Sequence, residues 1–307
     1  MKRDRFHTCL VLGGGGSRGL SHLGVLQVLE REKVPIDSIV GTSAGALVGA
    51  VYALEPDAEL ATERAISYFQ SDNFQKHPFK QVLMKSPEVE QNFLSSILSS
   101  VKKSYVFSNL LRRPSIFPIE RLAEIIDDLG PDMRFEDTKI PFAVPALDIR
   151  SGEEIMLTRG PLRPAVLASC SLPGFFPPVE HEGMLLADGG TIVPVPVSSA
   201  ATHFRATSTI AVDITSDLDL FPPEARGLDV ILRVDAIASK RINDLELATA
   251  DVLIRPAVGC RYWSDFSNFE ELVGHGVAAA EEHVETLRTL RRREATWPGS
   301  TARTETL

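Results

Sequence analysis

The fold is decided by the stretch Thr8-Cys9-Leu10-Val11-Leu12-Gly13-Gly14-Gly15-Gly16-Ser17-Arg18-Gly19. Its first residues form a short apolar run that ends in glycines, a pattern typical of a buried parallel strand. Apolar residues at helical spacing follow from Leu20 to Leu29, and the charged residues 30–33 and Pro35 end this helix. The sequence therefore predicts a strand, a glycine loop and a helix, in that order.

A second strand and helix follow directly. Residues 36–40 predict the strand, and residues 44–54 predict the helix. Gly41, Gly45 and Gly49 recur at a spacing of four residues, which leaves one face of the helix without side chains. We expect the backbone of a neighbouring element to approach closely along this face.

The remainder of the chain continues to alternate between strands and helices. A helix at 119–129 ends at Gly130-Pro131. The later apolar runs predict strands at 141–147, 154–157, 210–214 and 252–254, and a long final helix at 269–292. Such alternation indicates an α/β fold with a mostly parallel sheet covered by helices on both faces.

Composition narrows the class of partner. The 32 Lys and Arg residues against 41 Asp and Glu residues give a net charge of -9, so no nucleic-acid partner is expected. Three cysteines lie far apart without metal-ligand spacing, which fits a reducing cytoplasm. No apolar run has the length of a signal peptide core or a membrane span. We expect a soluble cytoplasmic protein, and contact with the inner membrane surface remains open.

The first chemical motif is Gly41-Thr42-Ser43-Ala44-Gly45, a G-x-S-x-G sequence between a predicted strand and a predicted helix. This context exposes a serine hydroxyl on a sharp turn, and the free N–H groups of the helix stabilise negative charge nearby. Ser43 is therefore a candidate nucleophile. The alternative is that Ser43 only caps the helix, since serine is a favoured capping residue.

The second motif is the glycine loop 13–19, which contains G-x-G-x-x-G at Gly14, Gly16 and Gly19. Such a loop suits a dinucleotide pyrophosphate, but that fold requires an acidic residue at the end of the second strand. In this sequence the position is occupied by Gly41-Thr42-Ser43. We interpret the loop as backbone N–H groups directed at an oxyanion, with Arg18 adding positive charge or tying the loop down.

The third motif is Ala187-Asp188-Gly189-Gly190, after the apolar residues 184–186. A carboxylate at the end of a strand is held partly out of water, which raises its pKa and makes it a better base. The alternative is an ordinary Asp-Gly turn.

Taken together, the three motifs resemble those of the patatin-like phospholipase family. The resemblance runs from about Thr8 to Val284 and includes residues 141–148, 168–178 and 194–196. It thins between about Asp57 and Ser115. The resemblance implies a three-layer α/β/α sandwich around a mostly parallel sheet. It also implies one domain at 1–293 with a variable helical cap at 57–115, and residues 294–307 are expected to form a disordered tail.

The resemblance also implies an activity. It implies hydrolysis of phospholipid or lysophospholipid esters through an acyl-enzyme, without a metal or organic cofactor. Its catalytic pair would be the nucleophile Ser43 and the base Asp188. The implied oxyanion hole consists of the backbone of Gly14, Gly15 and Gly16, and the residues expected to line the site are Arg18, Ala44 and Gly189.

Three alternatives stay open. A Ser-His-Asp triad of the α/β-hydrolase type needs a histidine after Asp188, and His203, His275 and His283 follow it. A dinucleotide-binding oxidoreductase would use the glycine loop, although the ribose-binding acid is missing. A non-catalytic lipid-sensing or scaffold protein would keep the same fold and motifs.

The cap carries one further hypothesis. Phe93, Leu94, Ile97, Leu98 and Val101 form an apolar stripe that is followed by Lys102 and Lys103. With Arg112 and Arg113, the segment either rests on an anionic lipid surface or packs on the domain as a lid.

Overall fold

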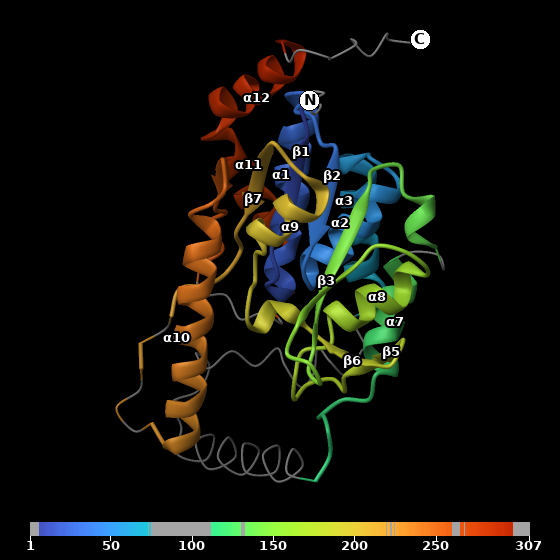
Figure 1. Cartoon of the computed structure of the whole chain (residues 1–307), viewed down its shortest axis with the longest axis vertical. Coiled ribbons are helices and arrows are strands. Elements are labelled where there is room, and N and C mark those ends of the chain that lie inside the picture. Colours follow the sequence, from blue (N-terminus) through green and yellow to red (C-terminus); the bar gives the residue numbers. More distant parts are fainter. Residues whose placement is uncertain are drawn as a thin grey trace.

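Figure 1 shows the computed structural model of the chain. The structure describes residues 6–72, 74, 112–129, 133–218, 220–221, 223, 225–259, 265–266 and 268–296.

A central sheet organises the molecule. Within the described residues it has eight strands in the order β5-β6-β3-β2-β1-β7-β8, with β4 paired to β3 off this path. The strands are β1 Thr8–Leu12, β2 Ser38–Gly41, β3 Phe142–Asp148, β4 Glu154–Leu157, β5 Val179–His181, β6 Met184–Ala187, β7 Ser208–Val212 and β8 Val252–Ile254.

The sheet is parallel on one side and antiparallel on the other. Strand β1 pairs in parallel with β2 and β7, and the pairs β2–β3 and β7–β8 are also parallel. Strands β4 and β6 pair antiparallel with β3, and β5 pairs antiparallel with β6. The predicted α/β class with a mostly parallel sheet is confirmed, and the short strand β5 was not predicted.

Helices cover both faces of the sheet (Figure 1). The α-helices are α1 Ser21–Arg31, α2 Ala44–Leu54, α3 Ala58–Gln70, α7 Glu120–Leu129, α8 Leu162–Ser169, α9 Val197–Phe204, α10 Gly227–Leu247, α11 Phe269–Glu281 and α12 Val284–Thr296. Three short 3-10 helices are η1 Gly16–Leu20, η2 Phe135–Asp137 and η3 Gly189–Thr191. None of the helices in the described ranges combines the length and apolar character needed to cross a bilayer.

Strand β1 shows why its sequence is continuously apolar. Leu10 and Leu12 are buried on the face covered by α1 and α2, whereas Cys9 and Val11 are buried on the face covered by α9. Because successive side chains point to opposite faces, a strand between two helical layers requires apolar residues at every position. The sheet thus has two hydrophobic cores, one on each side.

The predicted final helix at 269–292 is wrong in one respect. It is two helices, because α11 ends at Glu281 and α12 begins at Val284. The turn at 282–283 redirects the chain, so that Leu287 and Leu290 of α12 are buried in the same core as Ala279 and Ala280 of α11. Apolar spacing alone did not reveal this change of direction.

The predicted cap and tail are only partly described. Helix α3 lies in the predicted cap, and Asp57 caps its first turn, because the Asp57 carboxylate accepts a hydrogen bond from the Leu60 N–H at 2.8 Å. The apolar stripe at 93–101 and its lysines lie outside the described residues. Helix α12 extends to Thr296, so the first residues of the predicted tail at 294–307 are helical, and 297–307 lie outside the described residues.

Helices α1 and α11 cross at very close range. A Cβ atom at Gly276 would lie 1.9 Å from the carbonyl oxygen of Ser21, whereas a Cβ atom at Gly274 would meet nothing within 4 Å. The two glycines occupy the same helix, and only Gly276 faces α1. The crossing therefore depends on the absence of a side chain at position 276.

We expect Gly276→Ala to lower the free energy of unfolding by about 1–3 kcal/mol, because the methyl group forces the helices apart. The matched change Gly274→Ala should be neutral or stabilise by about 0.5–1 kcal/mol, since alanine favours a helix over glycine. Urea unfolding followed by circular dichroism measures both. Equal destabilisation by the two variants would contradict this account of the crossing.

Candidate active site

Ser43 occupies a strained turn between β2 and α2. Its backbone has φ 53° and ψ −117°, a left-handed region that residues other than glycine rarely adopt. The Ser43 side chain makes no hydrogen bond that caps α2. The structural alternative for Ser43, a simple helix cap, is therefore wrong, and the hydroxyl is available for another partner.

Neighbouring residues hold this strained backbone in place. The Ser43 N–H donates to the Ser169 hydroxyl at 2.9 Å, and that hydroxyl donates to the Pro145 carbonyl of β3 at 2.8 Å. The Cys170 thiol donates to the Ser43 carbonyl at 3.3 Å. A Cβ atom at Gly45 would lie 2.1 Å from the Leu12 carbonyl oxygen, which confirms the predicted close backbone approach at this position; at Gly49 the neighbours are the side chains of Phe142 and Ile39.

Sequence reasoning missed the roles of Ser169 and Cys170. Both lie at the end of α8, and both side chains are buried. The available signal was a cluster of small polar residues, Ser169-Cys170-Ser171, inside an otherwise apolar run. Buried hydroxyl and thiol groups need partners, so such a cluster indicates contact with backbone groups of another element.

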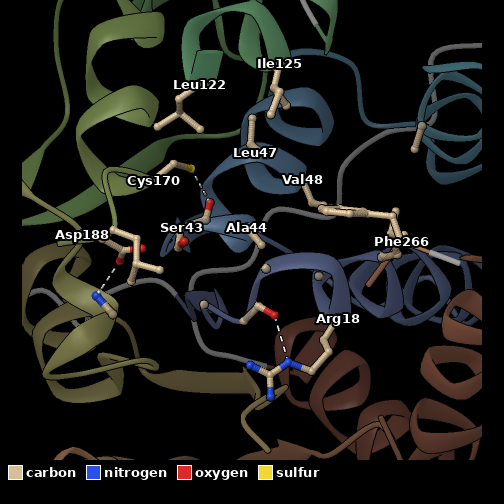
Figure 2. Close-up of a pocket in the computed structure, with 18 of the residues that line it drawn as sticks. Arg18, Ser43, Ala44, Leu47, Val48, Leu122, Ile125, Cys170, Asp188 and Phe266 are labelled. Carbon is tan, nitrogen blue, oxygen red and sulfur yellow. Dashed lines mark hydrogen bonds between the residues drawn. The ribbon is translucent and has the colours of Figure 1, made fainter. Parts of the chain in front are cut away.

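Asp188 follows β6 and faces Ser43 (Figure 2). One carboxylate oxygen accepts a hydrogen bond from the Gly190 N–H at 2.8 Å, and the Ser43 side chain lies on the other side of the carboxylate (Figure 2). Burial raises the pKa of Asp188 from 3.8 to about 6, and the nearby Ser43 hydroxyl and the Gly190 N–H offset only part of this rise. The structure thus places Ser43 and Asp188, the two candidate residues from the sequence, next to each other.

The glycine loop lies beside Ser43. A Cβ atom at Gly14 would be 3.3 Å from the Cβ atom of Ser43. The Gly14 N–H, however, donates to the Pro194 carbonyl at 3.1 Å and is not free to bind an oxyanion. This corrects the prediction for Gly14. The N–H groups of Gly15 and Gly16 donate to no group in the described part of the chain.

Arg18 orients one of these free amides. Its Nε atom donates to the Gly15 carbonyl at 2.9 Å. In a trans peptide the carbonyl and the following N–H point in opposite directions, so the Gly16 N–H points away from Arg18. Figure 2 shows the Arg18 guanidinium on the side of the loop away from Ser43. Arg18 is buried, which lowers its pKa, while Asp213 opposes this shift.

His22 supports the same loop from α1. Its Nε2 atom lies 2.8 Å from the Gly13 carbonyl and is assigned as the donor, because a carbonyl accepts. Complete burial lowers the pKa of His22 to about 4, so the ring is neutral at pH 7. We therefore give His22 a structural role.

The histidines considered for a triad lie elsewhere. His203 belongs to α9, His275 contacts Glu271 within α11, and His283 occupies the turn before α12. Among the residues that the structure describes, none of those lining the cavity beside Ser43 is a histidine. Asp148 likewise serves a turn, since its carboxylate accepts from Ser151 and from the Leu185 N–H.

A cavity of about 360 Å³ opens beside Ser43 and Asp188. Arg18 and Ala44 line it as predicted. Gly189 does not, and a Cβ atom there would point at the backbone of Ala146 and Leu147 in β3; Gly190 lines the cavity instead. Most of the remaining wall is apolar. Its apolar side chains include Leu20, Leu23, Leu47, Val48, Val51, Phe69, Phe74, Leu122, Ile125, Leu172, Phe176 and Phe266.

A strained serine, a buried carboxylate and a glycine loop thus line one largely apolar cavity together. Comparison with known families agrees with this arrangement, because the family model described as patatin-like phospholipase matches residues 10–201. The match covers more than half of the chain, and the chain belongs to this family.

Two relatives illustrate the similarity. An uncharacterized NTE family protein of Mycobacterium tuberculosis is 32% identical over 205 residues, which cover 67% of this chain and 48% of that protein. Patatin-like phospholipase domain-containing protein 6 of Homo sapiens is 34% identical over 295 residues, covering 87% of this chain and 19% of that protein. The chain therefore spans about half the length of the first and about a fifth of the second.

Solved structures give more distant similarities. VipD from Legionella pneumophila has a TM-score of 0.48 at 14% identity, covering 92% of this chain and 67% of that chain. Human GIVD cytosolic phospholipase A2 has a TM-score of 0.44 at 11% identity, covering 96% of this chain and 61% of that chain.

The raised pKa of Asp188 predicts a cost in stability. A carboxyl group with a pKa of about 6 when folded and 3.8 when unfolded binds its proton more tightly in the folded state. The free energy of unfolding therefore falls as pH rises from about 4 to about 6. At pH 7 we expect the free energy of unfolding of Asp188→Asn to exceed that of the wild type by up to about 3 kcal/mol. Near pH 3 the two free energies should agree.

Asp148→Asn is the matched control for this measurement. The hydrogen bond from the Leu185 N–H and that from Ser151 lower the pKa of Asp148, so its ionised form stabilises the fold. Asp148→Asn should therefore lower the free energy of unfolding at pH 7. Urea unfolding between pH 3 and pH 8 measures both variants, and destabilisation by Asp188→Asn at pH 7 would refute the proposed cost of burial.

Proposed function

We propose that this chain hydrolyses fatty-acyl ester bonds in phospholipids or lysophospholipids, with Ser43 and Asp188 as a catalytic dyad. The observation that carries the proposal is that Ser43, on its strained turn, faces the buried Asp188 carboxylate across one cavity. Membership of the patatin-like phospholipase family supports a lipid substrate. A relative named lysophospholipase NTE1, from Meyerozyma guilliermondii, supports the inclusion of lysophospholipids.

The proposed reaction begins with proton transfer. Asp188 accepts the hydroxyl proton as the Ser43 Oγ attacks the ester carbonyl carbon, and the carbonyl π bond becomes an oxyanion. Collapse of this intermediate expels the alcohol, which takes the proton from Asp188 and leaves an acyl-enzyme. Water then attacks the acyl group while Asp188 accepts its proton. That proton returns to the Ser43 oxygen as the fatty acid leaves.

The surroundings of the dyad suit this sequence. A carboxylate with a pKa of about 6 is ionised at neutral pH and holds a proton more firmly than an exposed aspartate. We assign the oxyanion hole to the N–H groups of Gly15 and Gly16, which have no other acceptor among the described residues. Fixed donors of this kind stabilise the charge that develops during attack.

We also propose that the protein acts in the cytoplasm. The free and buried thiols of Cys9 and Cys170 are consistent with a reducing compartment.

Ser43→Ala and Asp188→Ala should each lower kcat/KM for ester hydrolysis by roughly 10³-fold or more, because each removes half of one catalytic unit. For the same reason, the double variant should be little worse than either single variant. Hydrolysis of p-nitrophenyl esters, a phospholipid and a lysophospholipid measures these losses. A loss of kcat/KM in the double variant that equals the product of the two single-variant losses would argue against a dyad.

Two control variants separate catalysis from folding. Ser171→Ala removes another buried hydroxyl, which donates to the Leu167 carbonyl, and Asp148→Asn changes another buried carboxylate. Both should retain most of the activity. Labelling by a fluorophosphonate probe should disappear in Ser43→Ala and persist in both control variants. A wild-type protein that neither reacts with the probe nor cleaves any ester would instead favour the non-catalytic lipid-sensing alternative.

The pH dependence of the reaction tests Asp188 directly. Only the ionised carboxylate accepts the proton of Ser43, so kcat/KM should rise with pH, reach half its maximum at about 6 and then level off. Initial rates with an uncharged short-chain ester between pH 4.5 and pH 8 provide the profile. A flat profile, or a rate that falls across this range, is incompatible with Asp188 as the base.

A further inference from the structure

We propose that the rings of Phe69, Phe74 and Phe266 form the end wall of an acyl-chain cavity and set the longest chain that the site accepts. This inference rests on the proposed ester hydrolysis and adds the substrate class, a single acyl chain of limited length. The three rings line the same cavity as Ser43 and Asp188.

The cavity has two chemically different ends. Figure 2 places Ser43 and Asp188 on one side and Phe266 on the other, with Leu47 and Val48 of α2 between them. The Ser43 end contains the carboxylate and the glycine amides, which suit the ester group. Apart from Arg18, whose guanidinium binds the Gly15 carbonyl, the labelled lining side chains towards Phe266 are aliphatic or aromatic, so a hydrocarbon chain is the ligand that matches this end.

The three aromatic rings contact one another and close this end. Their ring centroids are 4.8 Å apart for Phe69 and Phe74, 4.9 Å for Phe69 and Phe266, and 5.3 Å for Phe74 and Phe266. Phe69 and Phe74 are buried in the core cluster that also contains Ile125 and Leu272. Phe74 packs edge to face against the other two rings, which are stacked on each other. Rings in contact at these distances form a stiff surface, which a longer chain would have to displace.

Helix α3 shows how the space in front of this wall is kept open. Its cavity face carries Ala61, Ala65 and Phe69, each one helical turn from the next, together with Arg64. The two alanines leave room, and the first large apolar side chain on this face is Phe69. Enlarging an alanine and truncating the phenylalanine should therefore change the usable length of the cavity in opposite directions.

The test uses p-nitrophenyl esters of increasing acyl length, from butyrate to stearate, and measures kcat/KM for each. We expect Phe69→Ala to raise the ratio of long-chain to medium-chain kcat/KM by roughly tenfold, because a few methylenes gain room. Ala65→Phe should lower the same ratio by roughly tenfold while short esters are still cleaved. Phe69→Leu provides a milder truncation should the alanine variant fail to fold.

Phe204→Ala is the matched control. Phe204 ends α9 and packs against the core on the opposite face of the sheet, and it does not line the cavity. Its truncation should leave the acyl-length profile unchanged. If Phe69→Ala, Phe69→Leu and Ala65→Phe also leave that profile unchanged while esters are cleaved, the end wall is refuted. If the wild type cleaves no ester and Ser43 is not labelled, the proposed function fails, and this inference with it.

Discussion

The active-site region depends on keeping the backbone of Ser43 in a left-handed conformation that serine does not favour. Strand β2 precedes this residue and helix α2 follows it, while Ser169 binds its N–H and Cys170 binds its carbonyl. Because Ser169 also binds the Pro145 carbonyl, the turn is tied to strand β3. The strain is thus balanced by contacts from segments far apart in the chain, and the hydroxyl is left to face Asp188.

Burial of charge is the second constraint, and it opposes stability. Asp188 and Arg18 are both largely removed from water. Burial raises the pKa of Asp188 and lowers that of Arg18, and both shifts favour the neutral form of the group. Asp213 partly offsets the cost at Arg18, and the Gly190 and Ser43 donors partly offset it at Asp188. A fold selected for stability alone would replace such groups with apolar ones, so their presence fits a site built for proton transfer.

The sequence was sufficient for the features that depend on local pattern. The strand, glycine loop and helix at 8–31, the elbow at Ser43 and the strand end at Asp188 follow from residue type and spacing, and all three occur in the structure. Features that depend on partners distant in the sequence could not be predicted from it. The Gly14 N–H binds the carbonyl of Pro194, and the Ser43 backbone binds Ser169 and Cys170. These partners lie far along the chain, and no local pattern around the glycine loop or Ser43 indicates them.

The contact between Arg18 and the Gly15 carbonyl has a consequence for the cost of reaching the transition state. Arg18 fixes the plane of the Gly15–Gly16 peptide in the free protein. In the proposed reaction, a loop held this way would not have to rotate when an ester binds, so no dipole would be reoriented as the bond forms. The guanidinium, which lies on the side of the loop away from Ser43, would thereby assist the reaction by holding the polar lining of the cavity in one orientation.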